Sequence, residues 1–308
     1  MLVGYGLMCL IYGTSYFAIK LGLAEGMPPL LFAGLRFFLA AVLVLAVLAW
    51  RRQLVPLRLR EWAEVALLGV LMTTIPFAAL FWSEQHISSG TAALLVATAP
   101  VFTTLISVVC RQMNWRWYVP AGLLLSLAGT ACLVGWPAAE PGGSIHALLG
   151  KWAIVVSELF FSWGAVRSRA WVARLTPFVF NGYQMLAASL VLLLLSAVTE
   201  PVSAVRFTGL SLAALAYLTV VVSIVASTLY YRLVQATNAA FPTTWTYVAP
   251  VIALAIGAVF LGEELTATSL AGSIGVLAGV ILLNGESWAR LFPLRTGGRL
   301  HVPPLDDK

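Results

Sequence analysis

Charged residues are scarce in this chain of 308 residues. Lys, Arg, Asp and Glu together make up 10% of it, whereas soluble domains contain about 25%, and hydrophobic residues make up 61%. So few charges cannot cover the surface of a soluble protein of this size, and most of the surface is therefore expected to face lipid. This composition excludes a cytosolic enzyme, a secreted domain and a disordered chain.

Cysteine and histidine are also rare. The cysteines Cys9, Cys110 and Cys132 lie in apolar stretches without CxxC spacing, and they predict free, buried thiols. The three histidines fall in loops or at loop edges, and no HExxH motif, GxSxG motif or paired catalytic carboxylates occur. The sequence therefore predicts neither an enzyme nor a cofactor or metal site.

Long apolar runs, by contrast, are abundant. A helix needs about 20 apolar residues to cross a bilayer. Ten such runs occur, at 2–22, 29–50, 64–83, 90–110, 117–136, 147–168, 177–198, 209–231, 240–261 and 267–285. Eight have no charged residue in their interior, and the other two contain Arg36 and Glu158. The runs lack the alternation of barrel strands, so we predict an all-α integral membrane protein with ten transmembrane helices.

The basic residues are distributed unevenly over the two ends of these helices. With the N-terminus placed on one side of the membrane, here called side A, 14 of the 18 Lys and Arg residues fall on side A and three on the opposite side B. The positive-inside rule makes side A cytoplasmic, together with both termini and the tail at 286–308. The net charge of +6 thus reflects orientation and gives no indication of nucleic-acid binding.

A repeat with a period of about 150 residues runs through the chain. The stretch Phe81–Val109 aligns without gaps on Tyr231–Val259 at an offset of 150. Further pairs follow at this offset or one residue more: Gly122 with Gly272, Gly129 with Gly279, and Tyr12-Gly13 with Trp163-Gly164. Residues 1–140 and 141–285 are therefore predicted to be two copies of a five-helix unit.

Because five is odd, the second copy starts from the opposite side of the membrane and the two copies are inverted. Inverted repeats are typical of secondary transporters, in which they surround a central cavity near the midplane and permit alternating access. Pro100 and Pro250 stand at equivalent mid-helix positions, where each removes a backbone hydrogen bond and favours a hinge. Membrane helices also tolerate prolines that have no such role.

Several motifs make the chain similar to a known group of transporters. They are Tyr12-Gly13-Thr14-Ser15-Tyr16, Pro28-Pro29, Arg36-Phe37, the segment Ser88–Pro100 with its copy Asn238–Pro250, and Phe260-Leu261-Gly262-Glu263-Glu264-Leu265. With these motifs the chain resembles the drug/metabolite transporter superfamily over about residues 4–285, and within it the ten-helix EamA-type exporters. It departs from the pattern after the fourth run, where Arg111-Gln112-Met113-Asn114 replaces a glycine-glutamate segment.

The many Trp and Tyr residues and the few charges are most similar to YddG-type amino-acid exporters. This resemblance implies a 5+5 inverted architecture in a bacterial cytoplasmic membrane and export of aromatic and other neutral amino acids. It implies a small-molecule substrate and the lipid bilayer as partners. A monomer is compatible with the sequence, which does not determine the oligomeric state.

Aromatic and polar residues inside the runs are the candidate substrate contacts. Their rings, hydroxyls and amides suit an aromatic amino acid, and plain helix packing explains them equally well. They are Tyr12, Ser15, Tyr16, Trp82, Trp163, Tyr183, Gln184, Trp245 and Tyr247. Tyr12 and Trp163 are repeat equivalents, so both are expected to face the same centre. Gln184 stands at the position of Arg36 in the second copy, at an offset of 148.

Arg36 and Glu158 are the two charges of opposite sign within the runs. An arginine inside a span costs about 2.5–3.5 kcal/mol and is expected to face the bundle interior with a partner. We predict an ion pair between Arg36 and Glu158, with direct contact of Arg36 to a substrate carboxylate as the alternative. Glu158 is also the candidate for coupling transport to protons, and facilitated diffusion remains open.

Two other cargoes are compatible with the same architecture. An amphipathic organic cation fits because aromatic rings bind cations. A nucleotide sugar or sugar phosphate fits less well, since such anions need several basic residues in the cavity and the sequence offers Arg36 with Lys20 at the rim.

Overall fold

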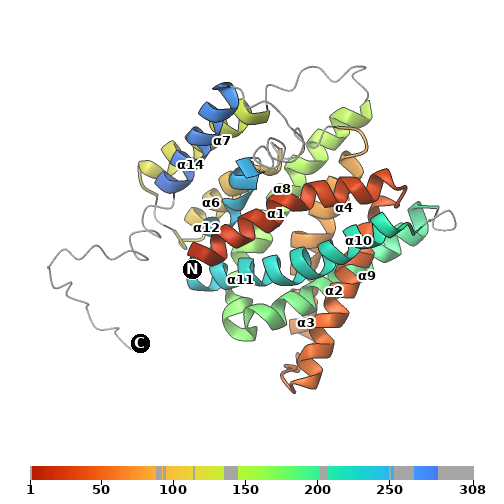
Figure 1. Cartoon of the computed structure of the whole chain (residues 1–308). Coiled ribbons are helices and arrows are strands. Elements are labelled where there is room, and N and C mark those ends of the chain that lie inside the picture. Colours follow the sequence, from red (N-terminus) through yellow and green to blue (C-terminus); the bar gives the residue numbers. More distant parts are fainter. Residues whose placement is uncertain are drawn as a thin grey trace, which may run out of the picture.

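The structure, a computed structural model, describes residues 2–87, 92, 95–113, 115–134, 145–201, 207–249, 251–252 and 267–283. Within these ranges every regular element is a helix (Figure 1). Six of the helical segments are long and apolar enough to cross a membrane, and shorter apolar helices accompany them. The prediction of an all-α, multi-span membrane protein is confirmed.

The first half of the chain contributes α1 (Leu2–Ala24), α2 (Pro29–Trp50), α3 (Leu59–Gly69), the π-helix η1 (Val70–Thr74), α4 (Ile75–Ser83), α6 (Ala99–Val109) and α7 (Tyr118–Val134). The second half contributes α8 (Ile145–Leu175), α9 (Pro177–Thr199), α10 (Gly209–Tyr217), the π-helix η3 (Leu218–Ala226), α11 (Ser227–Ala236), α12 (Ala240–Thr243) and α14 (Ala267–Leu283). The elements α3, η1 and α4 form one continuous span, as do α10, η3 and α11.

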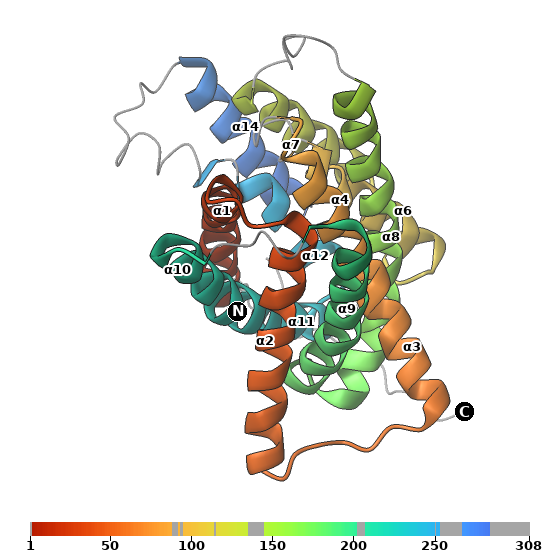
Figure 2. The same cartoon turned by 90° about the vertical axis from the view of Figure 1, so that its right-hand side faces the viewer.

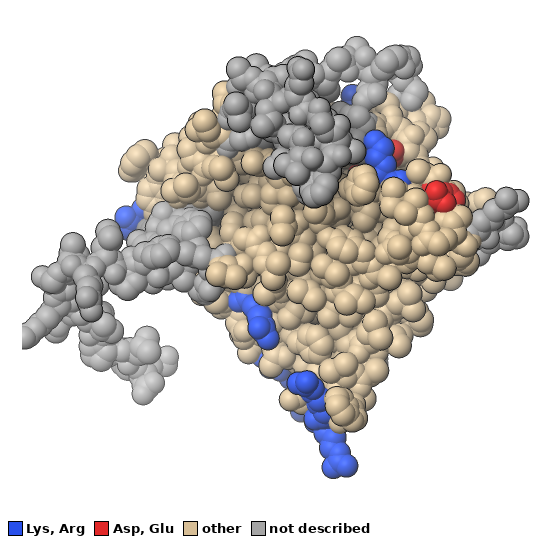
Figure 3. All heavy atoms as spheres, in the orientation of Figure 1, with Lys and Arg blue, Asp and Glu red and all other residues tan. Residues whose placement is uncertain are grey.

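The outer surface of these spans is apolar. On α2 and α9 the exposed side chains are large and hydrophobic, among them Val42, Leu43, Leu190 and Leu194. On the face shown in Figure 3, the Lys, Arg, Asp and Glu side chains lie near the margins, with a broad uncharged band between them. This distribution is the one that a lipid bilayer requires of a spanning protein.

A wide helical turn interrupts the third span of each half. In the first half it is η1, followed by Pro76, whose ring cannot donate the regular hydrogen bond of an α-helix. In the second half it is η3, and the Ser227 hydroxyl donates to the carbonyl of Val222, five residues earlier, at 3.3 Å. The same irregularity thus occurs at equivalent places in both halves.

Helices α7 and α14 pack side by side through glycines (Figure 2). A Cβ atom on Gly122 would lie 2.9 Å from the carbonyl oxygen of Gly279, and one on Gly129 would lie 2.8 Å from that of Gly272. Since Gly272 and Gly279 are the repeat equivalents of Gly122 and Gly129, exchanging the halves reproduces the contact. A two-fold relation between the halves requires this reciprocity.

Helices α2 and α9 pack in the same reciprocal way (Figure 2). A Cβ on Gly34 of α2 would lie 2.8 Å from a methyl group of Leu193 on α9. At an offset of 148, Gly182 of α9 is the equivalent of Gly34, and a Cβ there would lie 3.5 Å from Leu45, the equivalent of Leu193. The inverted relation of the two halves therefore organises the centre of the molecule as well.

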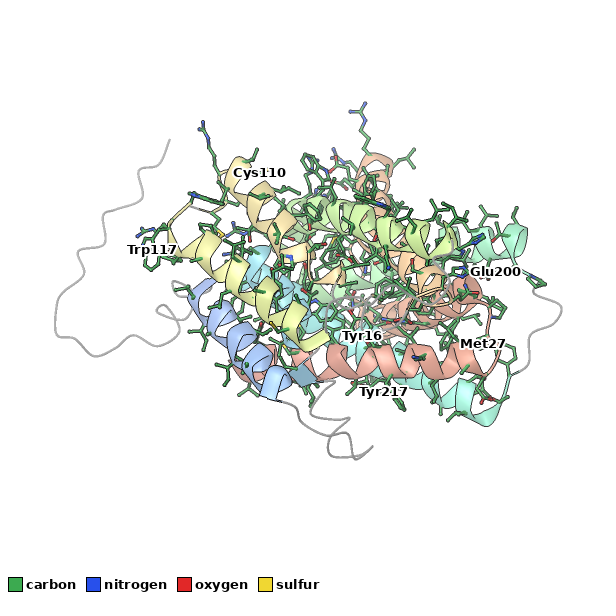
Figure 4. All side chains as sticks on the ribbon, turned by 90° about the horizontal axis from the view of Figure 1, so that it is seen from above. Tyr16, Met27, Cys110, Trp117, Glu200 and Tyr217 are labelled. Carbon is green, nitrogen blue, oxygen red and sulfur yellow. The ribbon has the colours of Figure 1, made fainter. Side chains whose placement is uncertain are left out.

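The two ends of the bundle carry the residues that the topology assigns to them. Figure 4 shows Met27 and Glu200 at one end and Cys110 and Trp117 at the opposite end, which are sides B and A. The prediction of three buried thiols is only partly right: all three are free, and Cys9 is buried, but Cys110 and Cys132 are exposed. Lipid accepts an exposed thiol because cysteine behaves as a small hydrophobic residue.

The expected proline hinges have different outcomes. Pro100 is the second residue of α6, which begins after a turn at residues 97 and 98, so the fourth span is broken before Pro100 rather than kinked at it. A proline suits this place because the first turn of a helix needs no amide donor. Pro250 and the tail at 286–308 lie outside the described residues.

Candidate functional site

Arg36 lies in the middle of α2 and is 1% exposed. Its Nε donates to the Ser223 hydroxyl on η3 at 2.9 Å. The guanidinium carbon stands 4.5 Å from the ring centre of Phe37 and 4.8 Å from that of Phe77, so two aromatic faces hold the cation. Its Nη1 is buried and has no hydrogen-bond partner in the part of the chain that the structure describes.

A buried polar network extends from this arginine to Gln184. The Asn181 amide on α9 donates to the Ser223 backbone carbonyl at 3.0 Å, and the Gln184 amide donates to the Asn181 side-chain oxygen at 3.2 Å. The Thr73 hydroxyl on η1 donates to the Gln184 oxygen at 2.9 Å. Residues of both halves thus meet in one chain of hydrogen bonds in the core.

The ends of this network repeat one contact. Ser223 stands 150 residues after Thr73, and Gln184 stands 148 residues after Arg36. The Arg36–Ser223 bond of one half therefore corresponds to the Gln184–Thr73 bond of the other. The structure brings Arg36 and its expected counterpart together, and it places them in the same role of joining the second helix of one half to the third span of the other.

Tyr12 and Trp245 form an aromatic stack close to Arg36. Their ring centres lie 4.3 Å apart with planes inclined by 30°, and the Tyr12 hydroxyl hydrogen-bonds to that of Ser227 at 3.1 Å. Tyr12 also lies within electrostatic range of Arg36. Ser15 is buried, and its hydroxyl donates to the Tyr12 carbonyl at 2.7 Å, so it is occupied within its own helix.

Glu158 does not pair with Arg36, and the predicted ion pair is wrong. Glu158 is 6% exposed, and with the described residues it forms neither a hydrogen bond nor an ion pair. It lies within electrostatic range of Tyr16 and Tyr230, whereas Arg36 binds Ser223. Tyrosines therefore stand near both buried charges: Tyr12 near Arg36, and Tyr16 and Tyr230 near Glu158.

Three other residues that the sequence predicts as substrate contacts, Trp163, Tyr183 and Tyr247, lie away from Arg36. Trp163 is 48% exposed on the outer stripe of α8, where its neighbours at helical spacing are Trp152, Val156, Leu159 and Phe160. Its side chain faces outward because the helix turns the stripe of Gly150, Ser157 and Glu158 inward. The prediction that Trp163 faces the centre with Tyr12 is therefore wrong.

Tyr183 and Tyr247 also have other surroundings than expected. The Tyr183 hydroxyl accepts from the Val55 amide at 3.1 Å and donates to the Val55 carbonyl at 2.8 Å, which fastens the loop at the side-A end. Tyr247 packs in a separate cluster with Ala97, Val276 and Val280, and its buried hydroxyl has no hydrogen-bond partner within the described ranges.

A cavity of about 730 Å³ opens at the side-B end. Its lining includes Met27, Pro28, Ala78, Trp82, Gln85 and Glu200. The Glu200 carboxylate accepts hydrogen bonds from the Leu30 and Leu31 amides at 2.7 and 2.8 Å. It thereby caps the N-terminus of α2 from the end of α9 and joins the two halves at this rim. Trp82 belongs to this mouth.

Glu84 directly follows α4, and the next residue, Gln85, lines this cavity. Both oxygens of its carboxylate are buried, and neither has a hydrogen-bond partner among the described residues. Burial raises the pKa of Glu84 to about 7, and the nearby Lys20 ammonium lowers it in part. A carboxyl group with such a pKa exchanges protons near neutral pH.

Sequence reasoning missed several members of the site. They are Phe77, Asn181, Ser223, Ser227, Tyr230 and Glu84 as a buried group. Ser223 could have been found, since it is the repeat equivalent of Thr73 in an apolar span. The others carry no repeat signal, because their counterparts in the other half are of a different residue type.

Comparison with known proteins agrees with this architecture. The uncharacterized inner membrane transporter YedA of Escherichia coli K12 is 32% identical over 295 residues, which cover 93% of this chain and 90% of YedA. A probable terminal-alkyne amino-acid exporter of Streptantibioticus cattleyicolor is 29% identical, covering 79% of this chain and 80% of that protein. A solved crystal structure with 21% identity covers 94% of this chain and 97% of its own, with a TM-score of 0.76, and shows the same fold.

The EamA-like transporter family matches twice, over residues 3–135 and again over 148–285. The two matches fall on the halves that pack reciprocally through α7 and α14. With its buried polar centre, apolar outer surface and helices long enough to span a bilayer, the protein is a membrane transporter. The chain belongs to the EamA-like transporter family.

Proposed function

We propose that this protein exports aromatic and other neutral amino acids by alternating access between its two halves. The observation that carries this proposal is the guanidinium of Arg36, which is buried in the core with one nitrogen that no described residue partners. An arginine in the core of a membrane protein is costly, and such residues are therefore rare and mark functional sites. A carboxylate is the partner that an arginine binds best, and every amino acid has one.

The surroundings of Arg36 suit the rest of such a substrate. The stacked rings of Tyr12 and Trp245 offer an aromatic wall with a hydroxyl and an indole donor. Glu158, on the other half, is a buried carboxylate without a partner among the described residues and is a counter-charge for an amino group. An amino acid carries one group for each of these charges, since its carboxylate and its ammonium stand on the same carbon atom.

The comparisons support this cargo class at a coarser level. One relative is named a probable terminal-alkyne amino-acid exporter, and it aligns over most of both chains.

For the path of transport, we propose that residues 1–140 and 141–285 rock against each other, with Pro100 and Pro250 as hinges. Side A, which carries both termini, faces the cytoplasm of a bacterial cell, and side B faces outward.

Counterflow in proteoliposomes tests the proposal. Vesicles loaded with unlabelled phenylalanine, tryptophan, methionine or threonine receive a trace of the labelled amino acid outside. We expect saturable exchange in the wild type, and about a 100-fold lower kcat/KM in Arg36→Gln, because a charged hydrogen bond to the carboxylate is lost. Arg60→Gln changes an exposed arginine and is the matched control.

Two results would contradict the proposal. One is full exchange activity in Arg36→Gln, which would show that the guanidinium does not bind cargo. The other is a folded, inserted wild type that exchanges none of the four amino acids.

An amphipathic organic cation is the second candidate cargo. The observation in its favour is Glu158, an unpartnered carboxylate within electrostatic range of Tyr16 and Tyr230, because carboxylates and aromatic rings bind organic cations. Labelled tetraphenylphosphonium in the same vesicles distinguishes the two. Exchange of this cation, lost in Glu158→Gln and retained in Arg36→Gln, would favour the second candidate.

A further inference from the structure

The connection between α2 and α3 concentrates positive charge at the side-A end of the molecule. Arg51, Arg52 and Arg58 fall within eight residues of the chain, and all three are exposed. No Asp or Glu stands between them, and none of the three forms an ion pair with a described residue. Basic clusters next to the end of a spanning helix are typical of segments that contact anionic lipids.

The acid nearest to this cluster along the chain is already engaged. Glu61, in the first turn of α3, accepts a hydrogen bond from the Arg58 amide at 2.7 Å and forms an ion pair with Arg174 of α8. The guanidinium of Arg174 in turn lies 5.3 Å from the ring centre of Trp171. The second half of the chain thus neutralises Glu61, and the charge of the connection remains for a partner outside the molecule.

The backbone of the connection is held in place. Two backbone hydrogen bonds of a Schellman motif close the end of α2 and fix Arg52 at a φ of 54°. In the middle of the connection, the Tyr183 hydroxyl of α9 bonds to both the amide and the carbonyl of Val55. The arginines therefore project from a preformed surface, which loses little conformational freedom when it binds a ligand.

Apolar neighbours place these arginines at the boundary of the lipid. Trp50, directly before Arg51, is 82% exposed, and Leu59, directly after Arg58, is 86% exposed. Tryptophan prefers the level of the lipid headgroups. The connection lies where α2 reaches beyond its neighbours (Figure 2), and Lys and Arg side chains project from the same tip in Figure 3.

The kind of basic residue points to phosphate. Of the 14 basic residues assigned to side A, Lys308 is the one lysine. The positive-inside rule counts lysine and arginine alike, so it does not explain this preference. A guanidinium binds a phosphate through two parallel hydrogen bonds, which an ammonium cannot form. The repeat equivalent of the connection, residues 199–208 on side B, contains Arg206 as its one basic residue.

We propose that Arg51, Arg52 and Arg58 bind the phosphate groups of anionic phospholipids in the side-A leaflet, with Trp50 and Leu59 at the adjoining edge of the acyl chains. Because Tyr183 ties this connection to α9, the bound lipids strengthen the attachment of the first half to the second. This contact does not depend on which cargo the protein carries.

Melting curves in dodecyl maltoside test the contact. The probes are dioleoylphosphatidylglycerol and dioleoylphosphatidylcholine, which share their acyl chains and differ in headgroup charge. With phosphatidylglycerol at about 100 times its dissociation constant, we expect the wild type to melt about 5 °C higher than with phosphatidylcholine. In the triple variant Arg51→Gln, Arg52→Gln, Arg58→Gln this rise should fall to about 1 °C, since each arginine strengthens binding about fivefold and the three together about 100-fold.

A second triple variant is the matched control. Arg111→Gln, Arg167→Gln, Arg232→Gln removes three exposed arginines at the end of α6 and on α8 and α11, and Arg111 occupies the same Schellman motif as Arg52, at a φ of 55°. It should keep the rise of the wild type. Native mass spectrometry counts the bound phosphatidylglycerol molecules directly, and fewer should remain on the first triple variant than on the second, whatever their stabilities.

Three results would overturn the proposal. Equal losses in the two triple variants would show that the charge of side A acts as a whole and that the connection is no binding surface. An equal rise with phosphatidylcholine would show that the headgroup charge is not recognised. The same rise with sodium phosphate in place of lipid would assign the surface to free phosphate. None of these measurements involves cargo, so their outcome leaves the proposed amino-acid export to its own test.

Discussion

At the contact between α7 and α14, the two halves of the chain contribute the same residue type, Gly129 from the first and Gly279 from the second. At the level of Arg36 they differ, since the equivalent residue of the second half is the neutral Gln184. The packing contacts are duplicated, whereas the charged groups occur in one half each.

This difference has a physical reason. Close packing of two related halves is satisfied by the same small residues on both sides of the two-fold axis. The proposed amino-acid cargo, with a carboxylate and an ammonium on the same carbon atom, has no such symmetry, so a site that orients it needs different groups on the two sides. Arg36 occurs in the first half and Glu158 in the second, and neither has a charged counterpart: Arg36 corresponds to Gln184, and an offset of 151 from Glu158 leads to Leu7.

Substituting the glycines of the duplicated contact is expected to have the largest effect. A Cβ on Gly129 would lie 2.6 Å from the Val276 amide nitrogen, and one on Gly279 would lie 2.5 Å from that of Ser126. Backbone atoms cannot move aside without separating the helices, so Gly129→Ala and Gly279→Ala should each lower the free energy of unfolding by about 3 kcal/mol. Thermal unfolding in detergent measures this.

Gly6→Ala provides the control, since a Cβ at Gly6 meets nothing within 4 Å. It should not lower the melting temperature, and a small rise is expected because Ala favours a helix more than Gly does. A large loss in Gly129→Ala with none in Gly279→Ala would show that the halves do not share this contact equally.

A smaller effect is expected where the halves differ at the side-B mouth. Glu84 is the counterpart of Val234 at an offset of 150. Burial raises the Glu84 pKa from 4.5 to about 7, so the folded protein binds this proton more tightly than the unfolded chain does. The free energy of unfolding therefore falls as the pH rises from 4.5 through 7, by on the order of 2 kcal/mol.

Melting curves at pH 5 and pH 8 test this dependence. The wild type should melt about 5 °C lower at pH 8. In Glu84→Val, which gives the first half the residue of the second, this difference should shrink, and Glu84→Gln separates the loss of charge from the change of shape. An unchanged difference in both variants would mean that Glu84 does not titrate in this range.

The duplicated features were the ones that the sequence could predict. The offset of about 150 residues between Gly122 or Gly129 and its counterpart can be seen without any knowledge of side-chain directions. It predicts the two inverted halves and the contact between α7 and α14. Arg36 and Glu158 were found as the buried charges of the described chain because charge inside an apolar run is rare. These predictions depend on residue type and spacing alone.

The directions of single side chains could not be predicted in the same way. Trp163 and Tyr12 are repeat equivalents, but the rotation of α8 about its own axis places Trp163 on the outer stripe. The prediction of an Arg36–Glu158 ion pair was wrong because two residues at a similar depth in the membrane can lie on different sides of the helix bundle. Tyr183 lies at the end of its helix nearest the 51–58 loop, and the bonds to Val55 depend on the path of that loop.

The smallest expected effect comes from replacing the ring of Tyr12 or of its repeat equivalent Trp163 by a leucine side chain. Tyr12→Leu removes the stack with Trp245 and the bond to Ser227, which should lower kcat/KM for tryptophan about tenfold relative to threonine. Trp163→Leu keeps an apolar side chain on a lipid-facing stripe, where substitutions change stability by about 0.5 kcal/mol or less. Counterflow with both amino acids, run beside melting curves, measures the two variants together. If Trp163→Leu changed cargo preference as much as Tyr12→Leu, the two rings would act on the substrate as equivalents, and the asymmetry between the halves would be confined to the charges.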